Sequence, residues 1–94
     1  MSQRNSFKNY KIEFKNAAKK DLKKLEKSVA DKIRDTLLKL ISGEPNVDVI
    51  KMQGIVELYR IRSGKFRIVF EAHKHIITIL VVSIGPRKDI YKDF

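Results

Sequence analysis

Two runs of alternating apolar and charged residues constrain the fold of this chain more than any other feature. They occupy residues 58–70 and are separated by the pair Ser63-Gly64. Successive side chains of a strand point to opposite faces and a two-residue loop joins neighbouring strands tightly, so the pattern predicts a β-hairpin. With Ser63 and Gly64 as the loop, the predicted cross-strand pairs are Arg60 with Arg67, Arg62 with Lys65, and Ile61 with Phe66.

The predicted hairpin places four cations on one face, namely Arg60, Arg62, Lys65 and Arg67. Like charges that lie opposite each other destabilise a sheet, and within this hairpin no Asp or Glu is interleaved with the cations. Guanidinium groups bind phosphate through two parallel hydrogen bonds and stay charged near neutral pH. We therefore interpret this face as a phosphate-binding site. The alternative is a solvated polar face, the usual environment of charged strand residues.

The length and composition of the chain indicate one domain. Its 94 residues, 43% of them hydrophobic, suffice for one core and not for two, so residues 1–94 are predicted to form a single domain. Residues 1–9 are mostly polar and are expected to be flexible. No apolar run approaches the roughly 20 residues that a membrane span needs, and the start of the chain lacks the pattern of a signal peptide. We therefore expect a soluble cytoplasmic protein without a membrane partner.

The positive net charge of the chain favours binding partners that carry negative charge. A formal charge of +10 on so small a protein favours RNA, DNA, an anionic membrane or an acidic protein. The chain has no cysteine, which removes disulfides, zinc-finger spacings and thiol nucleophiles. It also lacks a Gly-rich phosphate loop and the clustered carboxylates of a two-metal nuclease. We therefore expect neither a metal nor another cofactor.

The segments before the hairpin predict one strand and two helices. Residues 10–14 alternate as a short, half-buried strand. A lysine-rich amphipathic helix follows, with Asn16 as its N-cap, and then a second helix with Ser28 as its N-cap and an apolar stripe that stops at Gly43. Residues 46–55 show little periodicity and are interpreted as a connection into the hairpin.

The segments after the hairpin complete the predicted sheet. Residues 71–75 indicate a polar turn, and the nearly unbroken apolar run at 76–84 predicts a central strand that is buried on both faces. Gly85-Pro86 ends this strand, and residues 87–94 form a short C-terminal tail. The predicted fold is α+β: a strand, a two-helix hairpin and three antiparallel strands, in one sheet with the helices on one face and the cations on the other.

Four further side chains are possible site residues. Arg87 follows the predicted central strand, whose end would bring it beside the hairpin cations, although an ordinary loop charge has the same pattern. Tyr91 could stack on a base or transfer a proton, but a tyrosine so close to the end of a chain more often anchors it. His73 and, two residues later, His75 fall in the predicted turn, remote in sequence from the cations, and we interpret them as turn residues.

Two stretches of this chain resemble the RelE toxins of the RelE/ParE superfamily. They are Leu-Tyr-Arg-Ile-Arg-Ser-Gly-Lys-Phe-Arg-Ile-Val-Phe at 58–70 and Ile-Gly-Pro-Arg-Lys-Asp-Ile-Tyr at 84–91. The resemblance extends more loosely to residues 16–25 and to Gly54, so it covers nearly all of the chain after residue 9. The order of helices and strands inferred from the sequence agrees with it.

The resemblance implies a toxin that an antitoxin holds inactive and that cuts mRNA in the ribosomal decoding site without a metal. Attack by the 2′-hydroxyl on the neighbouring phosphate would leave a 2′,3′-cyclic phosphate and a 5′-hydroxyl. By resemblance, Arg67 would hold the scissile phosphate, Arg87 would assist the leaving group, and Tyr91 would orient the base or assist proton transfer. The implied RNA-binding residues are Arg60, Arg62, Lys65 and Lys88, and the first two also complete the catalytic cluster.

The chain departs from the best-known RelE pattern at positions 60 and 62, where lysine is common. Arginine is a poor general base, so the substitution keeps phosphate binding but shifts proton abstraction towards Tyr91 or the ribosomal RNA. Positioning and electrostatics would then account for most of the rate.

Two other functions remain open at this stage. One is a ParE-like toxin that inhibits DNA gyrase by binding, and the other is a noncatalytic RNA-binding module whose affinity falls steeply with salt. In the toxin interpretations, the partner is an antitoxin whose acidic or amphipathic segment covers the basic face and the helix pair.

Overall fold

The computed structural model of the chain describes residues 7–44, 47–52 and 57–86. Its strands form one mixed β-sheet. The elements in chain order are β1 (Lys11–Phe14), α1 (Asn16–Lys23), α2 (Lys27–Ile41), β2 (Val49–Lys51), β3 (Leu58–Ser63), β4 (Phe66–His73), a 3₁₀ turn (Lys74–Ile76) and β5 (Thr78–Pro86). The strands lie in the order β1-β5-β4-β3-β2, and each neighbouring pair is antiparallel except β1 with β5.

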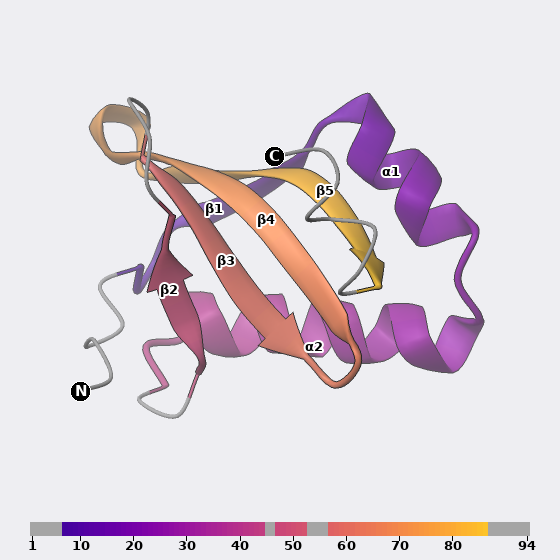
Figure 1. Cartoon of the computed structure of the whole chain (residues 1–94). Coiled ribbons are helices and arrows are strands. Elements are labelled where there is room, and N and C mark those ends of the chain that lie inside the picture. Colours follow the sequence, from indigo (N-terminus) through magenta and orange to yellow (C-terminus); the bar gives the residue numbers. More distant parts are fainter. Residues whose placement is uncertain (1–6, 45–46, 53–56, 87–94) are drawn as a thin grey trace.

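The two helices pack beside and behind this sheet. Figure 1 shows α2 crossing one face of the sheet, while α1 lies near the end of β5. Buried side chains of both helices belong to the same apolar core as those of β3, β4 and β5. The predicted α+β class is confirmed.

The apolar spacing of α2 explains which side it buries. Ala30, Ile33, Leu37 and Leu40 recur every three or four residues, so they share one face of the helix, and all four are buried. The helix ends at Ile41 with Ser42 as its C-cap, and the predicted stop residue Gly43 follows with a φ of +82°, which a residue without a Cβ readily adopts. The N–H groups of Gly43 and the next residue donate to carbonyls of the last turn, as in a Schellman motif.

The predicted N-caps are wrong for both helices. Asn16 and Ser28 lie inside the first turns, and the N-cap positions are Lys15 and Glu26, neither of which makes a capping side-chain bond. The start of α1 is set by the sheet instead, because the Lys15 N–H donates to the carbonyl of Val81 at 2.9 Å before the chain turns into the helix.

The β3–β4 hairpin forms with a different register from the predicted one. Its loop is Gly64-Lys65, and the observed pairs include Arg62 with Arg67, Arg60 with Val69, Ile61 with Ile68, and Ser63 with Phe66. The reason is the turn: Gly64 has a φ of +61°, as the first loop residue of a type II′ turn requires, and a Ser63-Gly64 loop would place a serine there. The shift moves each pairing by two positions, so the side chains that remain in the two strands keep their predicted faces.

The connection predicted at 46–55 contains an additional strand. β2 pairs with β3 at the sheet edge, with Ile50 opposite Arg60, so the sheet has one strand more than the sequence indicated. A three-residue strand is too short for its alternation to stand out, and pairing with β3 is what defines it.

The turn predicted at 71–75 begins later than expected. β4 continues to His73, and the reversal takes place at residues 74–77, where Ile77 adopts a left-handed φ of +49°. β5 then lies between β1 and β4 with buried residues on both faces, as predicted for an interior strand, although β4 is the middle strand of the five.

The start of the described chain is fixed by an aromatic cluster. Phe7 is buried and meets the rings of Tyr10, Tyr59 and Phe70 edge-on at centroid distances of 5.3, 5.0 and 5.5 Å. Residues 7–9 therefore differ from the expectation of a flexible start at 1–9, because one apolar side chain anchors them. No helix in the described ranges is both long and apolar enough to span a membrane.

Candidate phosphate-binding site

The face of the sheet turned away from α2 carries the predicted cations. Tyr59 and Ile61 of β3 point towards the helices and are buried in the core, so the intervening Arg60 and Arg62 point to the opposite face. Arg67 lies directly opposite Arg62 and shares its face. The prediction that these three arginines occupy one face is confirmed, although the partner of Arg67 is Arg62 and not Arg60.

Three cations surround one hollow at the loop end of the hairpin. The hollow has a volume of about 340 Å³ and is lined by Arg62, Gly64, Lys65, Phe66 and Arg67. Lys65 belongs to the loop and not to a strand, since the observed turn starts one residue later than predicted. An anion in this hollow would be attracted by three positive side chains from two strands and their connecting turn.

Arg67 is buried, unlike a typical charged residue of a sheet surface. Its exposed fraction is 2%, and its neighbours across the sheet are Arg62 on β3 and Gly85 on β5. A charge in such surroundings interacts more strongly with a bound anion than a solvated charge does, because water screens it less. This burial was not predicted, and it makes Arg67 the strongest candidate for direct contact with a phosphate.

Arg62 has an acidic neighbour that the hairpin sequence did not reveal. Its Nε lies 3.7 Å from Oδ2 of Asp48, and both side chains are about half exposed, at 50% and 51%. The Arg62 N–H also donates to the Asp48 carbonyl at 3.3 Å. Asp48 directly precedes β2, so the pairing of β2 with β3 brings a carboxylate beside Arg62, although Asp48 does not line the cationic hollow itself.

Arg60 lies on the same face but farther from the loop. It is half-buried, faces Val69 on β4 and Ile50 on β2, and does not line the hollow. Residues i and i+2 of a strand are about 7 Å apart along its axis, so Arg60 lies on the same face one such step farther from the hollow than Arg62.

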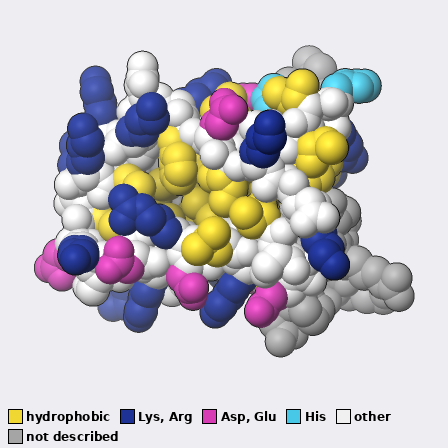
Figure 2. Space-filling view, turned by 180° about the vertical axis from the view of Figure 1, so that it is seen from behind, with side chains coloured by type: hydrophobic (Ala, Val, Ile, Leu, Met, Phe, Trp, Pro, Cys, Tyr) yellow, Lys and Arg dark blue, Asp and Glu magenta, His cyan; other side chains and the backbone are white. Residues whose placement is uncertain are grey.

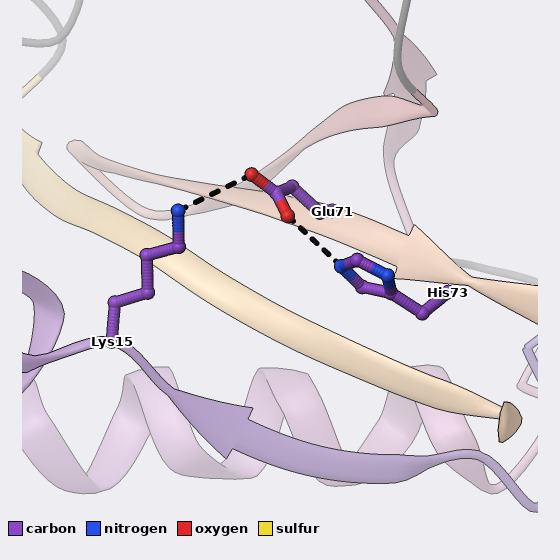
Figure 3. Close-up of polar contacts among 3 residues, drawn as sticks. All are labelled: Lys15, Glu71 and His73. Atoms are coloured by element: carbon purple, nitrogen blue, oxygen red, sulfur yellow. Dashed lines mark hydrogen bonds and ion pairs between the residues drawn. The ribbon is translucent and has the colours of Figure 1, made fainter.

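A polar cluster occupies the other end of this face. Glu71 of β4 contacts Lys15 Nζ at 3.4 Å and His73 Nε2 at 2.9 Å, as Figure 3 shows. Partial burial raises the pKa of Glu71, but the contacts with His73 and Lys15 outweigh this effect, so the net pKa lies below its ordinary value of 4.5. The carboxylate therefore stays ionised and acts as the acceptor of both contacts.

His73 is a strand residue and not the turn residue that we predicted. It ends β4 and shares the face of Arg67, six residues away, which corresponds to about 20 Å along the strand. That separation is too large for both side chains to contact one phosphate. His73 is therefore separate from the cations, as predicted, but because of its distance along β4 and not because it lies in a turn.

Arg87, Lys88 and Tyr91 lie outside the described residues, so their predicted roles stay predictions. Within the described ranges, no group of three or more Asp, Glu or His side chains is arranged to hold a metal ion.

The two residues that sequence reasoning missed left faint signals. Asp48 stands in Val47-Asp48-Val49, an apolar–polar alternation typical of a strand entry, and Glu71 continues the alternation of β4 beyond the predicted strand end at residue 70.

Comparisons with known proteins agree with this fold. Residues 12–91 match the model of the ParE toxin of type II toxin–antitoxin systems. A protein named as RelE-like toxin in Escherichia coli is 30% identical over 86 residues, covering 87% of this chain and 90% of that protein. The mRNA interferase RelE of Shigella flexneri is 25% identical over 88 residues, covering 89% and 92%.

Solved structures give the same result. The toxin of the RelB–RelE antitoxin–toxin complex from Methanococcus jannaschii matches with a TM-score of 0.71 and 28% identity, covering 87% of this chain and 98% of that one. The toxin chain of the intact E. coli RelBE complex matches with a TM-score of 0.67 and 26% identity, covering 82% and 95%. The chain belongs to the ParE toxin family of type II toxin–antitoxin systems and is a RelE-type member of the RelE/ParE superfamily.

Proposed function

We propose that this toxin is a cytoplasmic, metal-independent mRNA endonuclease that acts on ribosome-bound message. The observation that carries the proposal is the placing of Arg62 and Arg67 directly opposite each other, with Lys65 beside them, around one hollow. An RNA phosphate in this hollow would meet positive side chains from two strands and their turn, which favours binding of the anion. The name of the Shigella relative, mRNA interferase, supports the same activity.

The proposed reaction uses the substrate's own 2′-hydroxyl as nucleophile. Its oxygen bonds to the adjacent phosphorus, the bond to the 5′-oxygen breaks, and the products are a 2′,3′-cyclic phosphate and a 5′-hydroxyl. Arg67 holds the phosphoryl oxygens and stabilises the charge that builds on them, while Arg62 and Lys65 position the flanking backbone. Arg60 binds the neighbouring nucleotide.

Three residues of the tail complete the proposed mechanism. Arg87 assists departure of the 5′-oxygen, Tyr91 orients the base or relays the proton, and Lys88 binds RNA. Because arginines occupy positions 60 and 62, Tyr91 or a group of the ribosomal RNA accepts the proton of the 2′-hydroxyl.

The proposal is tested by mapping mRNA 5′ ends in a translation extract that receives the purified toxin. We expect new 5′ ends inside ribosome-engaged codons, and Arg67→Ala should lower the cleavage rate by about 100-fold, as loss of one group that stabilises transition-state charge typically does. Arg34→Ala, which removes an exposed guanidinium of α2, is the matched control and should cleave like the wild type. Absence of new ends with folded wild-type protein, or full activity of Arg67→Ala, contradicts the proposal.

A gyrase inhibitor is the second candidate, because the family model that matches the chain is named for the ParE toxin. This candidate predicts that the purified protein blocks DNA supercoiling in a reaction without ribosomes. A noncatalytic RNA-binding module instead predicts binding without any new 5′ end, together with equal behaviour of Tyr91→Phe and Tyr91→Ala.

The proposed partner is an acidic antitoxin, as the RelB–RelE complexes among the structural relatives suggest. Figure 2 shows apolar side chains gathered in the middle of the face that α2 crosses, with Lys and Arg side chains around them. A hollow of about 280 Å³ on the surface of α1, α2 and the end of β1 combines both properties, with Phe14, Lys19, Leu22, Lys23 and Arg34 as its lining. An amphipathic helix with an acidic rim would fit there.

The antitoxin proposal is tested by titrating the toxin with the acidic protein encoded beside its gene. The double variant Lys23→Glu/Arg34→Glu should bind at least about tenfold more weakly, because it places like charges across the contact. Lys32→Glu changes an exposed lysine of α2 that does not line the hollow and should bind normally. Equal affinity of all three proteins would exclude this hollow as the docking site.

A further inference from the structure

The outer edge of β5 loses its neighbouring strand before β5 ends. β1 pairs with β5 from Lys11 to Phe14, which lies opposite Val81, and after Lys15 the chain turns into α1. The last residues of β5, from Val82 to Pro86, therefore have β4 on one side and no strand on the other within the described residues. Backbone N–H groups on such an edge need another acceptor.

One side chain of α1 supplies that acceptor. The Ile84 N–H donates to Oδ2 of Asp21 at 3.0 Å, in a partly buried contact between residues 63 positions apart. A carboxylate is a stronger acceptor than a neutral carbonyl, so this single bond can replace the missing strand at that point. None of the ion pairs within the described ranges involves Asp21, although Lys20 and Lys24 lie close to it on the helix.

The strand end that Asp21 holds lies directly beside the candidate phosphate-binding site. Ile84 pairs with Ile68 of β4, and the next residue, Gly85, pairs with Arg67. The register of β5 against β4 shifts between Val69 and Phe70, close to the place where β1 ends. The regular pairing of β1, β5 and β4 before this irregularity therefore does not fix the pairing of β5 with β4 after it. Arg87 follows Gly85 by two positions in the sequence.

We propose that Asp21 is a positioning residue for the phosphate-binding site: by accepting the Ile84 N–H it keeps the end of β5 in register with β4 and so fixes the backbone beside Arg67. Without this bond the Ile84 amide has no other acceptor at the edge among the described residues, and the strand end opens locally while the core of the sheet stays closed. Its effect on activity rests on the proposed nuclease function, whereas its effect on phosphate binding does not.

The test compares Asp21→Ala, which removes the acceptor, with Asp21→Asn, which keeps an acceptor oxygen but loses the charge. Asp35→Asn is the matched control, because Asp35 is an exposed carboxylate of α2 that pairs only with Lys39 among the described residues. Hydrogen exchange of the backbone amides in the full chain reports on the bond itself. Single-turnover cleavage of mRNA on programmed ribosomes gives two separate quantities. They are the cleavage rate at saturating ribosome concentration and the ribosome concentration at which half of that rate is reached.

In Asp21→Ala we expect exchange at Ile84 and Gly85 to accelerate by about tenfold, as for loss of one hydrogen bond to a buried amide, with exchange at Ile79 unchanged. The cleavage rate at saturating ribosomes should fall by about tenfold, with the half-saturating concentration within about twofold of the wild-type value. Asp21→Asn should recover most of both losses, and Asp35→Asn should show neither.

Several results would overturn the proposal. Faster exchange at Ile84 with wild-type cleavage means that Asp21 only stabilises the edge, and equal defects in Asp21→Asn and Asp21→Ala mean that charge and not the hydrogen bond matters. If Asp21→Ala does not fold, Asp21→Glu displaces the carboxylate by one methylene, and amide exchange and cleavage must then change together.

A wild-type protein that does not cleave would end the nuclease proposal and leave this one testable. The readout is then a titration with inorganic phosphate, followed through the NMR signal of the Arg67 guanidinium. Asp21→Ala should weaken phosphate binding by about threefold or more, as expected when a buried contact near the site is lost, relative to Asp35→Asn. Equal phosphate affinity of the two variants contradicts a positioning role.

Discussion

The two faces of the β3–β4 hairpin are built from neighbouring residues of the same strands, yet one face packs into the core and the other carries positive charge. On the face towards α2, Tyr59, Ile61, Ile68 and Phe70 are at most 7% exposed and form the centre of the core. On the other face, Arg60, Arg62 and Arg67 gather positive charge within reach of a hollow. Because side chains alternate between the two faces, one face contributes mainly to stability and the other mainly to anion binding. A substitution on the core face should therefore leave binding largely unchanged, and a substitution on the cationic face should leave stability largely unchanged.

The largest effect is expected for Ile68→Ala on the core face. Ile68 is fully buried opposite Ile61, so the substitution leaves a cavity and should lower the free energy of unfolding by about 2–5 kcal/mol. Urea denaturation measures the loss, and Ile76→Ala, which truncates an isoleucine that is 64% exposed, is the control. A loss below about 1 kcal/mol would show that the core face is not what holds the hairpin in place.

Arg62→Ala, on the cationic face, should weaken RNA binding while leaving stability nearly unchanged. It removes one of two facing cations and a half-exposed contact with Asp48, so the free energy of unfolding should change by less than about 0.5 kcal/mol. Affinity for single-stranded RNA should fall by about tenfold, with a shallower dependence on salt, as expected when a phosphate contact is lost. Filter binding at several salt concentrations checks the second part. A large loss of stability with unchanged binding would reverse the assignment of the two faces.

High pH should weaken the core face through Tyr59. Burial, together with the hydrogen bond that its hydroxyl donates to Glu57 at 2.6 Å, raises the pKa of Tyr59 from 10.0 to about 12. The folded state favours the neutral phenol, so this contribution is complete below pH 10 and is lost as the pH rises towards 12. Denaturation midpoints measured across this range should fall more steeply for the wild type than for Tyr59→Phe. Identical slopes would mean that the phenol does not contribute.

The smallest effect is expected for Asp48→Asn, which alters the acidic neighbour of Arg62. Removing the carboxylate 3.7 Å from Arg62 leaves that cation free to meet an anion, so RNA affinity should rise by about two- to threefold. Asp31→Asn, which alters an exposed carboxylate of α2, is the control for net charge. Equal gains in the two variants would indicate a general field effect and no specific competition at the hollow.

Much of this molecule could be predicted from local patterns. The helical spacing that ends at Gly43 and the period-two alternation of residues 58–70 each depend on a few adjacent residues, and both elements form as predicted. The predicted face of the three hairpin arginines was also right, since a shift of two positions in pairing does not change the parity of a strand, but Lys65 lies in the loop.

The hairpin register was wrong for a local reason, the turn conformation at Gly64, whereas other failures came from residues far apart in the chain. β2 is defined by its pairing with β3, and the start of α1 by a bond from Lys15 to β5. The cation cluster was predicted without an acid because Asp48 lies outside the hairpin and reaches Arg62 only through the sheet.

The amino-acid sequence by itself determined which elements form and which side chains share a face, because propensity and alternation act over a few residues. Only the tertiary structure decided that Arg67 is buried, that Asp48 neighbours Arg62 and that Asp21 holds Ile84. Those three features depend on strand register and on where β1 ends, which are settled by the packing of the whole sheet against its helices.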